Sequence, residues 1–186
     1  MSEALRPEPS AFSQALPIVL GYVPVGFAYG VLAVKSGLSL ANTALMSVIV
    51  FAGSAQLIAV GLLAAGAPAL SVVLTAFVVN LRHLLMSAAL APWLSAWPRR
   101  LLALFCFEMT DETFALHLSR FQRGDRALGL TLGINFVAHA SWVGGGVLGA
   151  LSGSLIGDVR PLGLDFALPA IDRKSTRLNS SHYQNS

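Results

Sequence analysis

The chain has 186 residues, of which 55% are hydrophobic and only 11% are charged, and its formal net charge at pH 7 is +3. Soluble domains carry about 25% charged residues, so a mean hydropathy of +0.69 with so few charges excludes an ordinary soluble fold. Before residue 172 the chain holds nine basic and eight acidic residues, a balance that argues against a nucleic-acid-binding surface. The single cysteine, Cys106, excludes a disulfide framework and a cysteine-based metal site.

The length and the apolar runs predict an all-α, polytopic helical membrane protein with about five spans, because each span needs about 20 residues. The runs lack the two-residue alternation of barrel strands and are too long for them, so the spans are expected to be helices. The first ten residues are polar and contain no small-residue cleavage site. We therefore expect a polar N-terminal tail over residues 1–10 and no removable signal peptide.

The first predicted span covers residues 11–34 and contains two prolines and three glycines. In one interpretation, the segment GYVPVG frees backbone carbonyls in the middle of the membrane, which is tolerated only against protein or a water-lined cavity. Tyr22, Pro24 and Gly26 would then contact a transported substrate. In the other, the prolines only kink the helix, and the GxxxG pair of Gly26 and Gly30 allows close helix packing. The two interpretations are compatible.

The second predicted span, residues 42–63, carries the segment FAGSAQ in its middle. Small residues there allow close approach of two backbones, while Ser54 and Gln56 offer hydrogen bonds in apolar surroundings. Gly53, Ser54 and Gln56 are therefore candidate site residues.

The third predicted span, residues 69–92, carries Arg82, the only formal charge between residues 36 and 97. An arginine in the middle of a membrane helix costs about 2.5–3.5 kcal/mol and rarely faces lipid. Asn80 and His83 lie within one turn and add polar atoms that need partners. One hypothesis is that these three residues line an aqueous or substrate-filled cavity. The alternative is that Arg82 reaches an interface or locks two helices together.

Residues 101–120 begin with an apolar run and then become acidic at Glu108, Asp111 and Glu112. In a continuous helix this spacing places three carboxylates on one face, where mutual repulsion favours uptake of a proton by one of them. Alternatively, Thr110 or Asp111 caps a new helix after a break. A third possibility is an amphipathic helix that lies at the membrane interface with its acidic residues in water.

The next span lies within the uncharged residues 127–157 and contains His139. A lone histidine of this kind is more typical of an interhelical hydrogen bond than of a metal site, and no motif such as HExxH occurs. The segments GVLAVKSG at residues 30–37 and GVLGALSG at residues 146–153 agree at five of eight positions. This match is a weak indication of an internal repeat, which is a common feature of transporters.

The orientation in the membrane depends on whether residues 101–120 cross it. If they cross, the basic residues of the loops divide equally between the two sides. If they do not, Lys35 shares one face with Arg99, Arg100 and the arginines of residues 120–126. The positive-inside rule then favours an N-terminus on the outer side.

The segment FALPA at residues 166–170 looks like the start of a further span, but from Asp172 the sequence is polar and has no apolar face. Residues 172–186 resemble a read-through from technical sequence at the end of an incomplete gene. We treat them as a non-native tail and leave them out of the fold prediction.

Five segments, in order, resemble motifs of the AzlC family, the large subunit of branched-chain amino-acid exporters. They are PVGFAYG (24–30), FAGSAQ (51–56), NLRH (80–83), TDETF (110–114) and FALPA (166–170). The resemblance implies a multi-pass permease of the cytoplasmic (inner) membrane that exports hydrophobic amino acids together with a small membrane subunit of the AzlD type. The family continues with further apolar spans after FALPA, so we expect residues 11–171 to be a truncated permease domain.

The candidate residues for substrate binding or transport share a place in these motifs or beside them. They are Tyr22, Pro24, Gly26, Gly53, Ser54, Gln56, Asn80, Arg82, His83, Asp111 and Glu112. The chain contains no nucleotide-binding GxxxxGK[ST] loop, so export would depend on an ion gradient, most simply of protons. Asp111, and after it Glu112, is the expected proton carrier.

Two other classes of function compete with the permease. One is a membrane channel or a structural membrane subunit. The other is an intramembrane enzyme, in which His83 or His139 with Asp111 would activate Ser54 or Ser87. No serine lies in a recognisable nucleophile motif, so we predict no enzymatic activity, and we expect no cofactor, no metal and no nucleic-acid partner.

Overall fold

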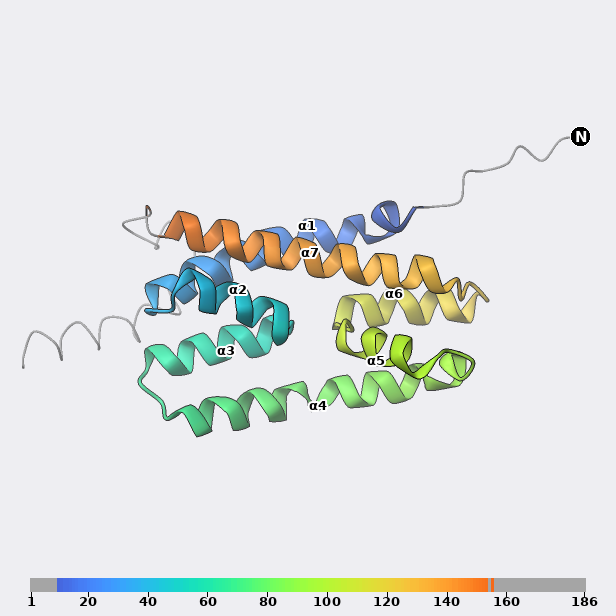
Figure 1. Ribbon diagram of the computed structural model, residues 1–186, viewed down its shortest axis with the longest axis horizontal. Helices are drawn as coiled ribbons and strands as arrows, with labels where there is room; N and C mark the ends of the chain where they lie inside the picture. Colours follow the sequence, from blue (N-terminus) through green and yellow to red (C-terminus); the bar gives the residue numbers. More distant parts are fainter. Residues whose placement is uncertain (1–9, 154, 156–186) are drawn as a thin grey trace, which may run out of the picture.

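The computed structural model describes residues 10–153 and residue 155, and these residues form helices and turns without a strand. The helices are α1 (Ala11–Lys35), α2 (Leu40–Ile49), α3 (Gly53–Ala64), α4 (Ala69–Leu94), α5 (Arg99–Phe107), α6 (Asp111–Gln122) and α7 (Leu128–Gly153) (Figure 1). The prediction of an all-α protein is confirmed. The predicted segment at residues 166–170 and the tail at residues 172–186 lie outside the described residues, as does nearly all of the N-terminal tail.

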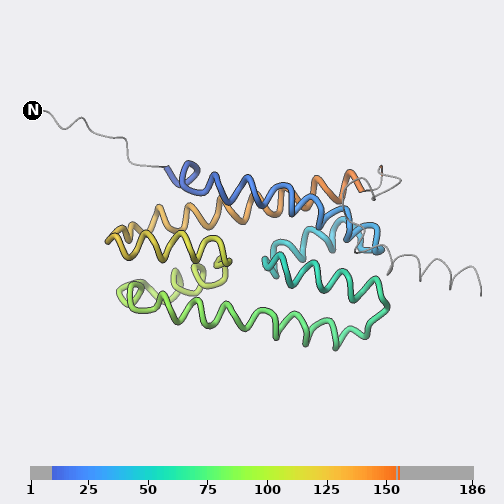
Figure 2. Tube along the Cα trace, turned by 180° about the vertical axis from the view of Figure 1, so that it is seen from behind, coloured from blue at the N-terminus to red at the C-terminus, as the bar shows by residue number. Residues whose placement is uncertain are grey.

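In the described part of the chain, three helices are long and apolar enough to cross a membrane: α1, α4 and α7, with 25, 26 and 26 residues. At about 1.5 Å per residue, each is longer than the roughly 30 Å hydrocarbon core of a bilayer. All three run along most of the length of the molecule, α1 and α7 in the same direction and α4 in the opposite one (Figures 1 and 2). The chain is a multi-pass helical membrane protein.

Helices α2 and α3 form a re-entrant hairpin that reaches the middle of the molecule and returns to the end at which it entered (Figures 1 and 2). The turn contains Phe51, whose φ of 39° is rare for a residue other than glycine and costs about 1–3 kcal/mol. Ala52 is extended, and Gly53 begins α3. The prediction of one span over residues 42–63 is therefore wrong, because non-helical backbone at Phe51 and Ala52 reverses the chain.

Helices α5 and α6 form a second re-entrant hairpin, which enters from the opposite end of the molecule (Figure 1). Thr110 precedes α6 and caps it with a capping box: its side chain accepts a hydrogen bond from the Thr113 backbone, and the Thr113 side chain accepts one from the Thr110 backbone at 2.9 Å. Of the three alternatives for this segment, the break with a Thr110 cap is confirmed. A continuous helix and an amphipathic interfacial helix are wrong, because the chain reverses in the middle of the molecule.

Glycines bring α1 and α7 into close backbone contact. A Cβ atom added to Gly26 would lie 2.8 Å from the Trp142 carbonyl oxygen, and one added to Gly145 would lie 2.6 Å from the Val23 carbonyl oxygen. Gly30 likewise faces the backbone of α7. Small residues at such positions allow the close approach that drives helix association in membranes.

Helix α1 continues from Ala11 to Lys35 without interruption, although Pro17 and Pro24 lie inside it. The packing interpretation of its glycines is thus confirmed. The other interpretation, that the prolines free backbone carbonyls next to protein or a cavity, stays a prediction. Neighbouring helices can support a transmembrane helix across a proline, and α7 follows α1 along its glycine-bearing face.

Each hairpin is followed by one long helix, so the order α2–α3–α4 recurs as α5–α6–α7 in the opposite direction (Figure 1). This is the arrangement of an inverted structural repeat, in which α7 corresponds to α4. The short sequence match instead pairs α1 with α7, and its residues Gly30, Gly149 and Gly153 lie where these two parallel helices touch.

The hairpins also change the expected distribution of basic residues. Because α2 and α3 do not cross, Lys35 lies at the opposite end of the molecule from Arg99 and Arg100, which share their end with Arg123 and the start of α1 (Figures 1 and 2). The expectation that Lys35 shares a face with them is wrong. The positive-inside rule now favours a cytoplasmic location for the start of α1.

The α1–α7 contact generates a matched test on α7. A Cβ at Gly149 would collide with the backbone of Phe27, whereas at Gly144 nothing lies within 4 Å. We expect Gly149→Ala to destabilise the protein by about 1–3 kcal/mol through overpacking. Gly144→Ala should be neutral or slightly stabilising, because alanine favours helix more than glycine. Thermal unfolding in detergent, followed by circular dichroism, measures both, and equal midpoints for the two variants would contradict the packing account.

Candidate functional site

Three polar side chains from the middle of the three long helices meet at the tips of the two hairpins. They are Tyr22 of α1, Arg82 of α4 and His139 of α7. Each one contacts the α5–α6 tip, and each also touches the α2–α3 hairpin or its turn. The site is therefore built where the two re-entrant hairpins approach each other between the long helices.

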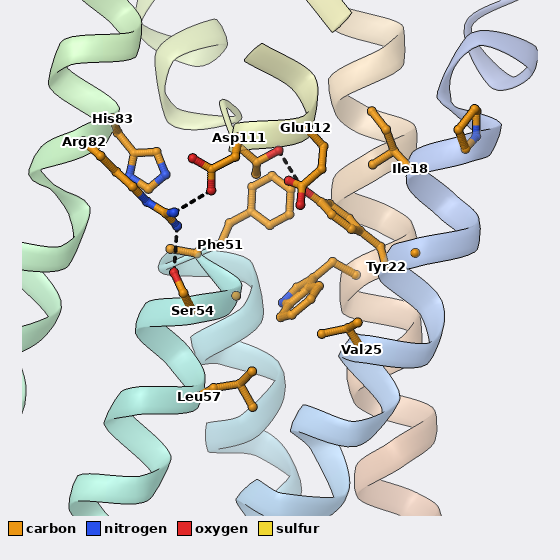
Figure 3. Close-up of a pocket in the computed structure, with 16 residues that line it drawn as sticks. Ile18, Tyr22, Val25, Phe51, Ser54, Leu57, Arg82, His83, Asp111 and Glu112 are labelled. Carbon is orange, nitrogen blue, oxygen red and sulfur yellow. Dashed lines mark hydrogen bonds and ion pairs between the residues drawn. The ribbon is translucent and has the colours of Figure 1, made fainter. Parts of the chain in front are cut away.

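Arg82 joins the two tips through its guanidinium group. One terminal nitrogen lies 2.6 Å from the Asp111 carboxylate, and the other donates a hydrogen bond of 2.7 Å to the Ser54 hydroxyl (Figure 3). The Arg82 side chain is 37% exposed, while its Nε atom is buried without a partner. Arg82 thus joins two elements, as the alternative hypothesis expected, and it also lines a pocket. That this pocket holds water or substrate stays a prediction.

Tyr22 binds the other side of the same tip. Its hydroxyl donates a hydrogen bond to the Glu112 carboxylate at 2.5 Å and lies 2.6 Å from the Thr110 hydroxyl (Figure 3). The ring packs edge-on against Phe51 and Trp142. Tyr22 thus fixes the first turn of α6 relative to α1.

His139 of α7 also contacts both hairpins. Its Nδ1 atom lies 2.9 Å from the Glu108 carboxylate, and its Nε2 atom lies 3.2 Å from the Ser47 backbone oxygen at the end of α2. The ring also stacks on Phe51 with a centroid distance of 4.0 Å. The prediction that His139 makes an interhelical hydrogen bond is confirmed.

The three acidic residues of the α5–α6 tip therefore diverge. Glu108 binds His139 of α7, Asp111 binds Arg82 of α4, and Glu112 binds Tyr22 of α1. This separation replaces the single acidic face that a continuous helix would have had. Among the described residues, no three histidine, cysteine or acidic residues are grouped so as to hold a metal.

A pocket with a volume of about 360 Å³ lies between α1, α3, α4 and α6. Figure 3 shows its polar rim, with Arg82 and Asp111 on one side and Glu112 with Tyr22 on the other. Its remaining walls are apolar and include Ile18, Val25, Phe51, Leu57 and Trp142. We call this cavity the central pocket. A cation, two carboxylates and an apolar floor give it the chemical character to bind a small zwitterion with an apolar side chain.

Seven of the eleven candidate residues line the central pocket: Tyr22, Gly53, Ser54, Arg82, His83, Asp111 and Glu112. The other four lie elsewhere. Pro24 is exposed, and Gly26 packs against α7. Gln56 is buried, where its amide accepts a hydrogen bond from Trp142 at 3.0 Å, and Asn80 lines a different cavity.

Several residues that line the pocket were not among the predicted site residues. Phe51 stood inside a quoted motif without an assigned role, Thr110 was predicted only as a possible helix cap, and Trp142 carried no polar signal. The spacing of His139 and Trp142, three residues apart, puts both on one face of α7 and could have indicated a buried polar seam. Gly53 is explained by Trp142, because a Cβ at Gly53 would lie 2.7 Å from the Trp142 ring.

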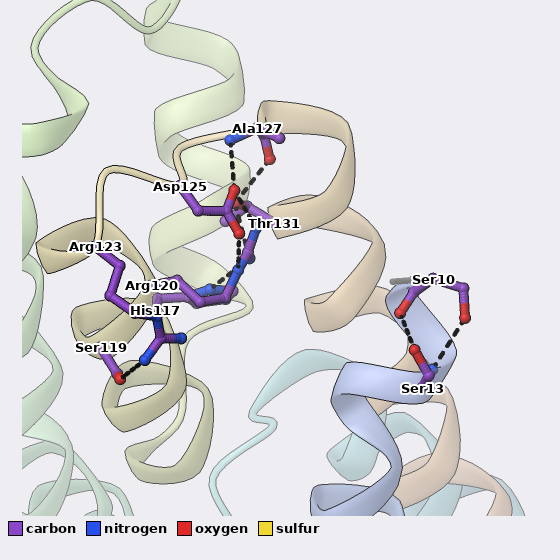
Figure 4. A network of polar contacts seen from close by, with 9 residues as sticks. All are labelled: Ser10, Ser13, His117, Ser119, Arg120, Arg123, Asp125, Ala127 and Thr131. Carbon is purple, nitrogen blue, oxygen red and sulfur yellow. Dashed lines mark hydrogen bonds and ion pairs between the residues drawn. The ribbon is translucent and has the colours of Figure 1, made fainter. Parts of the chain in front are cut away.

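A second polar network fixes α6 against α7 away from the pocket (Figure 4). The fully buried Arg120 makes two hydrogen bonds to Asp125, at 2.9 and 3.0 Å, and a third to Thr131. His117 hydrogen-bonds Asn135 across the same contact at 2.7 Å. In the loop between the helices, the hydrogen bonds from Arg120 hold the pKa of the Asp125 carboxyl below its ordinary value. The network makes α6 and α7 one unit, which positions the acidic tip.

Comparison with known proteins places the chain among its relatives. The family model described as AzlC protein matches residues 17–156. Inner membrane protein YgaZ of Escherichia coli is 35% identical over 163 residues, which cover 84% of this chain and 66% of the relative. An uncharacterized membrane protein of Archaeoglobus fulgidus is 35% identical over 142 residues, covering 76% of this chain and 61% of the relative.

A third relative has a functional name. The Branched-chain amino acid transport protein AzlC of Bacillus subtilis is 28% identical over 163 residues, which cover 87% of this chain and 63% of the relative. The chain thus spans between 61% and 66% of the lengths of these three proteins. No solved structure matches the chain. Because the family model covers most of the sequence and the motifs of the site fall inside the match, the chain belongs to the AzlC family.

Proposed function

We propose that this chain is the translocating subunit of an exporter of branched-chain and similar hydrophobic amino acids in the cytoplasmic membrane. The observation that carries the proposal is the central pocket, where Arg82 and Glu112 lie at a polar rim above an apolar floor. A substrate carboxylate would bind Arg82 and Ser54, and its ammonium group would bind Glu112. The functional name of the Bacillus subtilis relative supports a substrate of this class.

The re-entrant hairpins support transport rather than a purely structural role. In membrane proteins, non-helical backbone at membrane depth is tolerated where it is buried in protein or lines a cavity. Transporters with inverted repeats place their substrate sites at such broken helices. A small subunit of the AzlD type, implied by the sequence resemblance, would be the partner. In the described part of the chain, Ser54 is hydrogen-bonded by Arg82 rather than by a histidine, which does not favour the enzymatic alternative.

We propose proton coupling through Asp111. Its carboxylate neutralises Arg82 in the structure, so protonation of Asp111 would release the guanidinium for the substrate carboxylate. Asp111 is the first residue of α6, and Thr110 provides the cap. Helix capping by Thr110 leaves the Asp111 carboxylate for Arg82, and this supports the proposed carrier role.

The first prediction concerns Arg82. Arg82→Lys keeps the charge but cannot contact Asp111 and Ser54 with the same planar fork, and Arg82→Ala removes both contacts. We expect each variant to weaken leucine binding by at least about tenfold, or about 1.4 kcal/mol. Binding of labelled leucine to the purified chain in liposomes measures this, with the exposed Arg99→Lys as the matched control. Normal binding and flux in both Arg82 variants, at equal protein level, would refute the assignment.

The second prediction concerns specificity. Because the floor of the pocket is apolar, leucine, isoleucine, valine and methionine should compete with one another, and lysine or glutamate should compete weakly. One methylene in such a pocket is worth only about 1–3 kcal/mol, so discrimination within the group should be loose. Leu57→Ala, which enlarges the floor, should improve competition by phenylalanine relative to valine. Competition assays in which lysine or glutamate binds best would overturn the proposal.

The third prediction separates the carrier role from a structural ion pair. Asp111→Asn retains size and hydrogen bonding but cannot exchange a proton, so it should abolish uphill export of leucine while downhill exchange continues in part. Glu112→Gln should have a smaller effect on uphill export. Uphill and downhill fluxes of labelled leucine in everted vesicles measure both. If Asp111→Asn and Glu112→Gln each export uphill at the normal rate, neither residue carries the proton.

A further inference from the structure

Glu108 and His139 form a polar contact at the centre of the molecule that the proposed transport cycle does not use. The Nδ1 atom of His139 lies 2.9 and 3.0 Å from the two oxygens of the Glu108 carboxylate. The two side chains are only 13% and 12% exposed, and neither lines the central pocket. Glu108 is the C-cap residue of α5, so the contact joins α7 to the α5–α6 tip.

The hydrogen positions in this contact follow from the partner of the other ring nitrogen. Nε2 of His139 lies 3.2 Å from the backbone oxygen of Ser47 in α2, and a backbone carbonyl only accepts hydrogen bonds. Nε2 therefore carries a hydrogen and donates it to Ser47. In a neutral imidazole only one ring nitrogen carries a hydrogen, so Nδ1 of a neutral ring would present a lone pair to Glu108.

The contact with Glu108 then requires one further proton. An ionised carboxylate has only acceptor atoms, so it cannot form a hydrogen bond with a bare Nδ1 at 2.9 Å. A proton between them makes the hydrogen bond, either on the ring or on the carboxyl group, and it belongs to the pair rather than to one residue. With this proton the pair has no net charge, which suits its low exposure in a membrane protein.

The requirement for this proton depends on the position of the α2–α3 hairpin, which supplies the Ser47 oxygen. If the hairpin moves away from α7, Nε2 loses its acceptor, and the ring is free to hold its one hydrogen on Nδ1. Nδ1 then donates directly to the ionised Glu108, and the further proton leaves to water. Phe51 of the same hairpin stacks on the His139 ring and lines the central pocket. Proton binding by the pair is thereby linked to the hairpin that forms part of the proposed substrate site.

The other titratable groups at the junction belong to separate contacts. Asp111 of α6 pairs with Arg82 of α4, and Glu112 of α6 donates no proton but accepts a hydrogen bond from Tyr22 of α1. His83 of α4 lies on the wall of the central pocket, and α2 and α3 contain no charged or titratable residue. The pair on α5 and α7 is therefore separate from the proposed carrier Asp111.

The pair also has a counterpart in the inverted repeat. Arg82, on the long helix of the first repeat, contacts α3 of its own hairpin and α6 of the other hairpin. His139, on the long helix of the second repeat, contacts the end of α5 in its own hairpin and α2 of the other. Each long helix thus holds one basic side chain between the two hairpins. Histidine and carboxylate side chains inside membrane proteins commonly carry protons in pumps and transporters.

We propose that Glu108 and His139 form a second proton-binding site, which holds one proton while the α2–α3 hairpin is docked on α7 and releases it to water when the hairpin leaves. The contribution of this proton to export rests on the proposed function. There it would be exchanged in each cycle in addition to the proton of Asp111.

The proton positions are measured directly by nitrogen-15 NMR of the full chain, labelled at histidine and held in lipid bilayers without leucine. The chain has four histidines, and the His139 signals are those that His139→Gln removes. At low pH we expect one hydrogen on Nε2 and one between Nδ1 and Glu108. As the pH rises, one proton should be lost in a single step, after which the remaining hydrogen is on Nδ1.

Glu108→Gln is the decisive variant, because its amide can donate to a bare Nδ1 and so replaces the further proton. His139 should then keep one hydrogen, on Nε2, at every pH, and the step should disappear. Asp111→Asn, at the same hairpin tip, is the matched control and should keep the step. In vesicles, the leucine gradient at which net export stops under an imposed pH gradient gives the number of protons exchanged per leucine. Glu108→Gln should lower this number by one.

The spectra and the fluxes can fail independently. A wild-type His139 whose hydrogen pattern does not change with pH, or whose Nε2 is bare at low pH, would overturn the proton site, and this result needs no variant. A step that persists in Glu108→Gln would overturn it too. If the step disappears in Glu108→Gln but the number of protons per leucine is unchanged, the role in coupling is wrong. Normal leucine binding in the Arg82 variants would instead refute the proposed function, whatever the spectra show.

Discussion

The middle of this protein depends on one short acidic turn. Glu108, Asp111 and Glu112 stand at the tip of α5–α6, and each is bound by a polar side chain from a different long helix. A charge at membrane depth is costly unless it is paired, and each of these carboxylates has its partner on a different long helix. A shift of α1, α4 or α7 would therefore leave one carboxylate unpaired. The need to pair all three carboxylates restricts how the three long helices are placed around the hairpins.

The two hairpin tips solve the same backbone problem in different ways. The α5–α6 tip satisfies the first turn of α6 locally, through the Thr110 capping box. The α2–α3 tip has no side-chain cap, since its N-cap residue is Ala52. Arg82 hydrogen-bonds Ser54 in the first turn of α3. The uncapped start of α3 lies at the central pocket, which is lined by Phe51, Ala52, Gly53 and Ser54.

Sequence reasoning reached the class of fold and much of the site from the cost of polar groups in apolar surroundings. The isolation of Arg82 pointed to a pocket, and Ser54, Asp111 and Glu112 were found because they are polar residues in or next to apolar runs. Prediction from the sequence failed at positions whose role depends on backbone geometry rather than on residue type. Residues 42–63 are uncharged and mostly apolar, and nothing in their composition shows that Phe51 takes a positive φ and reverses the chain. Trp142 and Phe51 are apolar, so only the fold reveals that they line the pocket.

Geometry also decides the roles of Pro24 and Gly26, which residue type alone does not show. Glycines and prolines indicate either a broken helix or a tight helix contact, and only the partner decides between them. Here α7 lies against α1, so Gly26 serves packing, while the real breaks occur in α2–α3 and α5–α6. The residues of the second hairpin were easier to interpret, because Thr110 carries a hydroxyl that can cap a helix.

The attachment of α4 links the structure to the proposed transport cycle. In the apolar 18-residue stretch of α4, only 6% of the residues are buried, whereas 44% are buried in the corresponding stretches of α1 and α7. Glycine contacts bind α1 to α7, and the Arg120 network binds α6 to α7, so these helices form the better-packed part of the molecule. Helix α4 joins the acidic tip through the Arg82–Asp111 pair. Leu90 and Leu94 of α4 also pack in an apolar cluster with Phe105, Met109 and Phe121, and α4 packs against α3. A substrate carboxylate or a proton that competes for the ion pair would therefore break the charged contact between α4 and α6 at the pocket while these apolar contacts hold α4 in place.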